Sequence, residues 1–84
     1  YLDLQGNKFE SIDEKMFIRL SNLIYLDFSN NKINLIDKNT FKMNRQLAYI
    51  TLNRNKIKKV ELLHLSKLEY LDISANNLDL IDDK

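Results

Sequence analysis

The stretch Tyr25-Leu26-Asp27-Phe28, completed by Asn31 and Ile33, decides the fold because the chain repeats this pattern. The pattern begins again at three other tyrosines, which are Tyr1, Tyr49 and Tyr70. The intervals between the first apolar residues of the pattern, Leu2, Leu26, Ile50 and Leu71, are 24, 24 and 21 residues. A fixed period of this length is typical of a solenoid of stacked repeats. We therefore predict one domain over residues 1–84, with repeats at 1–24, 25–48 and 49–69 and a partial repeat at 70–84.

Each repeat begins with a segment in which polar and apolar residues alternate. Leu26 and Phe28 are apolar, whereas Asp27 and Ser29 are polar, and this period of two predicts a short strand with one buried face. Because every repeat enters its strand in the same direction, we expect parallel pairing, with strands about 4.8 Å apart and equivalent residues in columns. The expected buried columns are Leu2, Leu26, Ile50 and Leu71, and then Leu4, Phe28, Leu52 and Ile73.

An asparagine follows each strand where the chain turns away from it. An asparagine side chain offers one acceptor and two donors, enough to bridge the backbones of successive turns. We interpret the four asparagines as a structural ladder rather than a ligand site; they are Asn7, Asn31, Asn55 and Asn76.

The second half of each repeat carries the signals of a turn or short helical segment. An acidic residue precedes this segment and is expected to cap its free N–H groups; these residues are Asp13, Asp37, Glu61 and Asp82. Phe17 and Phe41 are expected to fill the core from the far side. The third repeat is three residues shorter and lacks this phenylalanine, so we expect Leu63 or Leu65 to fill the space.

Composition excludes several classes of function. The 13 basic and 12 acidic side chains give a net charge of +1, which argues against binding nucleic acid or an anionic membrane through net charge. No run approaches the roughly 20 apolar residues of a membrane span. The chain has no cysteine and one histidine, His64, with no serine or cysteine nucleophile placed to pair with it. We predict no enzymatic activity, no metal site and no cofactor.

The repeated pattern resembles that of the leucine-rich-repeat family, L-x-x-L-x-L-x-x-N-x-L. Three copies match it: Leu23, Leu26, Phe28, Asn31 and Ile33; Leu47, Ile50, Leu52, Asn55 and Ile57; and Leu68, Leu71, Ile73, Asn76 and Leu78. The resemblance implies an α/β solenoid, a right-handed superhelix with a short-stranded parallel sheet on its concave face and turns or short helical segments on its convex face. The 24-residue spacing is similar to that of the animal extracellular class, which includes Toll-like receptors and insect immune proteins.

The family's usual binding surface is the concave sheet face, which implies a set of candidate partner-binding residues. They are Tyr1, Asp3, Tyr25, Asp27, Tyr49, Thr51, Asn53, Arg54, Tyr70 and Asp72. Tyrosine combines a large contact area with a polar tip and is enriched at interfaces. A tyrosine column can instead stack on itself and shield the backbone, and both interpretations stay open. The lysines near Arg54, which are Lys56, Lys58 and Lys59, fit either an acidic partner or a solvated face.

The leading functional hypothesis is a non-enzymatic protein–protein interaction module of an extracellular receptor-like or innate-immune protein. The expected partner is a protein ligand or co-receptor bound through the concave face, with homo- or hetero-oligomers possible and no contact with nucleic acid or membrane. The family's cysteine-rich end caps are absent, so we expect an interior stretch of a longer solenoid. The alternatives are an intracellular scaffold or regulatory subunit, and a targeting module of an enzyme.

Overall fold

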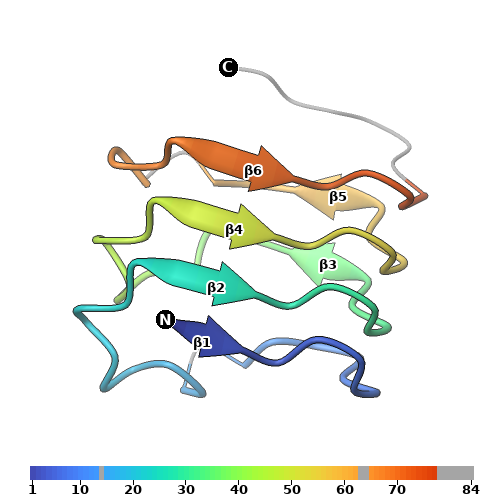
Figure 1. Ribbon diagram of the computed structural model, residues 1–84, viewed down its shortest axis with the longest axis horizontal. Coiled ribbons are helices and arrows are strands. Elements are labelled where there is room, and N and C mark those ends of the chain that lie inside the picture. Colours follow the sequence, from blue (N-terminus) through green and yellow to red (C-terminus); the bar gives the residue numbers. More distant parts are fainter. Residues whose placement is uncertain (14, 63–64, 78–84) are drawn as a thin grey trace.

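Short parallel strands stacked one above another form the front layer of the molecule. The computed structural model describes residues 1–13, 15–62 and 65–77. Strands β1 (Leu2–Asp3), β2 (Tyr25–Asp27), β4 (Tyr49–Thr51) and β6 (Tyr70–Asp72) make one four-stranded sheet in the order β1-β2-β4-β6 (Figure 1). Each strand belongs to a different repeat, so the chain winds once between neighbouring strands, as a solenoid requires.

The register of this sheet is the one that the sequence predicts. Leu2 pairs with Leu26, Leu26 with Ile50, and Ile50 with Leu71, always in parallel. Backbone bonds continue the stacking beyond the strands, as where the Phe28 amide donates to the Thr51 carbonyl at 2.8 Å. The expected first column is therefore confirmed: Leu26 and Ile50 are fully buried, and Leu2 and Leu71 are half-buried against the core.

A second, two-stranded parallel sheet lies behind the first one and was not predicted. It consists of β3 (Leu35–Ile36) and β5 (Lys59–Val60), with Leu35 opposite Lys59 (Figure 1). The Glu61 amide extends it by donating to the Ile36 carbonyl at 2.9 Å. These strands have two residues each and no alternation of polar and apolar residues, so they cannot be predicted from hydrophobic periodicity. The 24-residue offset between Leu35 and Lys59 was the available signal.

The core fills the space enclosed by these windings. Leu26, Ile50, Phe28 and Leu52 from the front layer are fully buried, and Ile36 meets them from the back layer. Three phenylalanines form its aromatic centre. The Phe17 ring lies 6.0 Å from the Phe28 ring and 6.3 Å from the Phe41 ring, as the predicted role of Phe17 and Phe41 requires.

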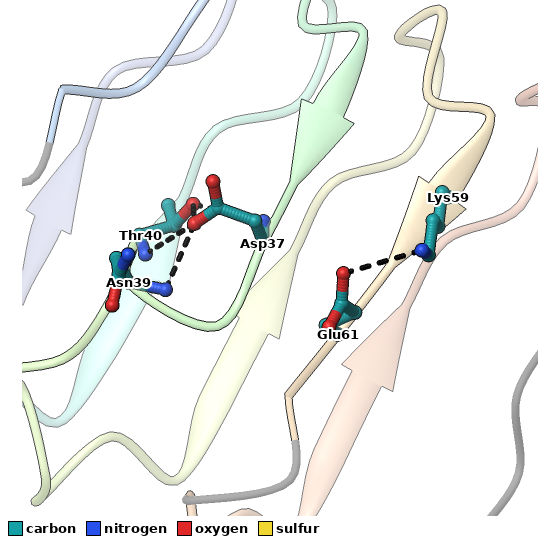
Figure 2. A network of polar contacts seen from close by, with 5 residues as sticks. All are labelled: Asp37, Asn39, Thr40, Lys59 and Glu61. Atoms are coloured by element: carbon teal, nitrogen blue, oxygen red, sulfur yellow. Dashed lines mark hydrogen bonds and ion pairs between the residues drawn. The ribbon is translucent and has the colours of Figure 1, made fainter.

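The far side is made of hydrogen-bonded turns, and the described residues contain no helix. Asp37 stabilises one such turn: its Oδ1 accepts from the Asn39 amide at 2.8 Å and from the Thr40 amide at 3.1 Å (Figure 2). Asp13 accepts similarly from the Lys15 amide at 2.9 Å. Of the two permitted alternatives, turns or short helical segments, the described chain takes the turns. The described residues therefore hold no helix that could cross a membrane.

Glu61 and Asp82 are the two remaining predicted caps. The Glu61 carboxylate lies 3.5 Å from the Lys59 Nζ atom across one strand residue (Figure 2). The amides that Glu61 is predicted to cap belong to residues 63 and 64, which lie outside the described residues. Asp82 lies outside the described residues.

The shortened third repeat closes its core with leucines. Leu65 is buried, as expected, while the other candidate, Leu63, and its neighbour His64 lie outside the described residues. Leu62 contributes as well, because it packs against the core and its carbonyl accepts from the Leu65 amide at 3.2 Å. Phe41 accepts from Asn44 in the same way in the second repeat, so Leu62 occupies the backbone position of the missing phenylalanine.

Candidate partner-binding face

The four tyrosines form a continuous stack along the open face of the four-stranded sheet. Ring centroids are 4.4 Å apart between Tyr1 and Tyr25, 5.9 Å between Tyr25 and Tyr49, and 6.3 Å between Tyr49 and Tyr70. The interplanar angle widens along this series from 9° to 34°. The parallel register places the rings on adjacent rungs, and the strand spacing of about 4.8 Å suits offset stacking. We call this set the tyrosine row.

The tyrosine row is both a structural stack and an exposed surface. Tyr1 is 79% exposed, Tyr70 48% and Tyr49 39%, while Tyr25 is half-buried between its neighbours. Burial and the adjacent Tyr1 raise the pKa of Tyr25 above its usual value. Self-stacking and availability for contact are therefore compatible, because Tyr1, Tyr49 and Tyr70 stay exposed while their rings stack on neighbouring rungs.

The aspartates beside the tyrosine row are held by hydrogen bonds within the chain. Asp27 Oδ1 accepts from the Ser29 hydroxyl at 2.7 Å, the Ser29 amide at 3.1 Å and the Thr51 hydroxyl at 2.8 Å. Asp72 accepts from both groups of Ser74, and Asp3 from Gln5. These carboxylates are oriented and partly satisfied before any partner arrives.

These hydrogen bonds determine how two of the carboxyl groups titrate. Burial acts to raise the pKa of Asp27, but the bonds from Ser29 and Thr51 outweigh it and hold the pKa below its ordinary value. The hydroxyl and amide of Ser74 likewise lower the pKa of Asp72, against a smaller effect of burial. Both groups are thus anionic at neutral pH, and their charge belongs to the surface that a partner would meet.

Thr51, Asn53 and Arg54 in the third repeat depart from the residue types of the other repeats, and their side chains have three different environments. Thr51 turns toward the second repeat, where its hydroxyl holds Asp27. Asn53 is half-buried, and its carbonyl accepts from the Asn30 amide at 3.0 Å. Arg54 is exposed and has a positive φ of 59°, at the position where the first repeat has Gly6. Of the three, Arg54 is the one whose side chain is exposed.

The asparagines behind this face tie each rung to the one before it. Asn55 Nδ2 donates to the carbonyls of Leu52 at 3.0 Å and Phe28 at 3.1 Å, while its Oδ1 accepts from the Ile33 amide at 3.0 Å. Asn31 and Asn76 make the equivalent bonds to their preceding rungs. Asn7 bonds only within its own turn, to Leu4 and Gln5. These residues align the rungs that carry the tyrosine row.

Sequence reasoning missed a further asparagine that links two repeats. Asn44 is 1% exposed, and its Nδ2 donates to the carbonyls of Phe17 at 3.0 Å and Leu20 at 3.1 Å. It lies on the far side, where the turn bonds make it equivalent to Leu20 and Leu65. A single asparagine in an otherwise apolar column was the signal that pointed to this role.

The described chain offers little to a metal ion or a small molecule. Within residues 1–13, 15–62 and 65–77, no group of three or more histidine, cysteine or acidic side chains is placed to hold a metal. One open hollow of about 320 Å³ is lined by Ser11, Ile12, Asn34, Leu35, Asp37, Asn39 and Thr40. Another open hollow, of about 360 Å³, is lined by Tyr1, Leu2, Arg19, Leu20, Asn22 and Leu23. The face that combines large aromatic groups with oriented carboxylates is therefore the sheet face, which suits a macromolecular contact.

Comparison with known families agrees with this geometry. The family model described as leucine rich repeat matches residues 1–57 and 36–78, and the chain belongs to this family. Among curated proteins, none matches the chain at a significant level. Leucine-rich-repeat domains are protein–protein interaction modules and typically have no enzymatic activity. The fold and the family together define this chain as a protein-binding solenoid segment.

Proposed function

We propose that the chain is the ligand- or co-receptor-binding segment of an extracellular, receptor-like protein of innate immunity, and that its partner binds across the tyrosine row. The 24-residue spacing of its first repeats supports the extracellular assignment by resemblance. The binding assignment rests on a different observation, the exposed aromatic stack on the open sheet face.

The tyrosine row supports binding because its geometry is preorganised. Stacking holds each ring against its neighbour, so little side-chain freedom remains to be lost when a partner docks. Its exposed members carry the two groups, ring and hydroxyl, that make tyrosine effective at interface centres. The neighbouring carboxylates of Asp27 and Asp72 are fixed by hydrogen bonds and add oriented charge beside the rings.

The binding surface is tested by comparing two double variants in crosslinking to natural partner proteins, which mass spectrometry identifies. Tyr49→Ala with Tyr70→Ala removes exposed rings from the sheet face. Ile18→Ala with Met43→Ala removes far-side groups that are 49% and 48% exposed, a similar fraction. We expect the tyrosine variant to lose a partner that the far-side variant retains, with both variants folded by circular dichroism. Equal retention by both would refute the assignment of the sheet face.

The extracellular location is tested on the natural protein in intact cells. A membrane-impermeant amine reagent labels lysines that face the medium, and this chain carries many exposed lysines. We expect labelling of the natural protein, or its recovery from the medium, without breaking the cells. Labelling only after lysis would favour the intracellular scaffold.

A further inference from the structure

Three lysines lie on successive rungs at the turn that follows the sheet. Backbone bonds fix their register: the Lys32 amide donates to the Phe9 carbonyl at 2.7 Å, and the Lys56 amide to the Ile33 carbonyl at 2.8 Å. Lys8 occupies the same position on the first rung, 24 residues before Lys32. All three are exposed, and rungs of parallel backbone are about 4.8 Å apart. We call Lys8, Lys32 and Lys56 the lysine row.

The lysine row is not neutralised by the acidic side chains of the described chain. The ion pair found within residues 1–13, 15–62 and 65–77 joins Lys59 to Glu61, which lie elsewhere. The carboxylates of Asp3 and Asp27, on the first two of these rungs, accept from glutamine, serine and threonine groups instead. Like charges on adjacent rungs repel each other, so the row favours an anionic group that bridges neighbouring lysines.

Arg54 adds a fourth cation, two residues before Lys56, and its side chain is exposed. Its backbone is held at φ 59° by the bond from its amide to the Ser74 carbonyl at 3.1 Å. Gly6, Asn30 and Ala75 occupy the equivalent positions, all at positive φ, so this conformation belongs to the repeat and arginine is the one charged residue among the four.

The pattern of charge favours an acidic peptide over a uniform polyanion. Tight binding of a nucleic acid or highly sulfated glycan draws on many cation contacts, whereas this chain has a net charge of +1. A uniform polyanion would also meet the carboxylates of Asp3 and Asp27 on the first two of these rungs. An extended peptide places alternate side chains on one face about 6.7 Å apart, a spacing that flexible lysine side chains can follow across rungs.

We propose that the lysine row, together with Arg54, binds an extended, carboxylate-bearing peptide segment of the partner protein, laid across the rungs at the end of the sheet. This inference rests on the proposed protein-binding function, but it assigns a surface distinct from the tyrosine row. Arg54 would form a bidentate pair with one carboxylate, and the lysines would bridge the next ones along the segment.

The test measures binding of a fluorescein-labelled peptide of alternating Glu and Thr to the intact chain by fluorescence anisotropy. We expect saturable binding that weakens with salt, and little binding of the matched peptide with Gln in place of Glu. Lys32→Glu with Lys56→Glu should lower affinity at least tenfold. Lys15→Glu with Lys42→Glu changes net charge equally, at exposed far-side lysines, and should lower it less than twofold.

Other results would overturn the inference. If both lysine double variants lose the same affinity for the peptide, binding depends on net charge and not on the lysine row. If the chain binds a heparin oligosaccharide or oligothymidylate more tightly than the peptide, the ligand is a different polyanion. Tyr49→Ala separates this inference from the proposed function. If Tyr49→Ala abolishes natural partner capture while the lysine-row variant retains it and binds the peptide normally, the proposed function stands and the lysine row is excluded.

Discussion

The Asn55 side chain stabilises a turn, a role that proline and glycine often share in other chains, and it does so by hydrogen bonding to the backbone. Its side chain serves the Leu52 and Phe28 carbonyls and the Ile33 amide, and it is only 7% exposed. The chain has no proline and a single glycine, so its turns depend on such side-chain bonds. The position of the asparagines was predictable from the repeat, because a buried turn must satisfy its backbone groups.

Removing this side chain should destabilise the molecule strongly. We expect Asn55→Ala to lower the free energy of unfolding by about 2–3 kcal/mol, since it leaves buried carbonyls and an amide without partners. Asn7→Ala is the matched control, because Asn7 is exposed and bonds only within its own turn. Urea denaturation measures both, and equal losses would contradict the role of the bonds between rungs.

The positive φ of Arg54 could not be predicted from its residue type, because the left-handed backbone region is normally occupied by glycine or asparagine. The structure has Arg54 and Ala75 there, at φ 59° and 55°. We expect Arg54→Gly to raise the free energy of unfolding by about 0.5–1 kcal/mol by relieving this strain. Arg54→Ala keeps the Cβ atom and should leave stability nearly unchanged. A gain with alanine equal to that with glycine would attribute the effect to charge instead of backbone conformation.

The pKa of Asp27 lies below its ordinary value in the folded state, so Asp27 makes the free energy of unfolding depend on pH. The stabilisation is present above the unfolded pKa of about 3.9 and is lost as the pH falls through the lower folded pKa. Thr51→Val removes the bond between rungs at nearly constant volume and should raise the pKa of Asp27. Carboxyl carbon shifts in an NMR titration measure this change. The pKa of Asp72, which bonds to Ser74, should stay unchanged as an internal reference.

At the scale of elements, the front sheet was predictable and the back sheet was not. Alternation and a fixed period define the strands at Tyr25 and Tyr49, because one face of each must be buried. β3 and β5 have no such pattern, and their pairing follows only once the front sheet sets the register. The hydrogen bond from the Thr51 hydroxyl to Asp27 could not be predicted from the sequence either, because the orientation of the Thr51 side chain depends on the neighbouring rung and not on the repeat pattern.

The far-side phenylalanines provide the element-scale prediction. Phe41 is fully buried and stacks on Phe17, so Phe41→Ala should lower the free energy of unfolding by about 3–5 kcal/mol. Met43 lies two residues further along the same turn and is 48% exposed, so Met43→Ala should change stability by less than about 0.5 kcal/mol. Calorimetry or urea denaturation compares the two. A small loss at Phe41 would mean that the turns contribute little to the core.

At the scale of the whole molecule, stacking in register converts single residues into rows. Tyrosines 24 residues apart become one aromatic surface, and lysines at the same interval become one basic edge. Each repeat contacts mainly its neighbours, so the rows exist only while the rungs stay aligned. The candidate binding face was predictable to this extent, while the identity of its partner depends on chemistry that the repeat does not encode.

The most direct test of this account is the strand register in solution. Two-dimensional NMR on the intact chain should show interstrand contacts linking Leu26 to Ile50 and Ile50 to Leu71 in parallel, together with contacts between the rings of Tyr25 and Tyr49. Contacts shifted by one residue, or an antiparallel pattern, would separate the tyrosines and the lysines from their rows and contradict the account.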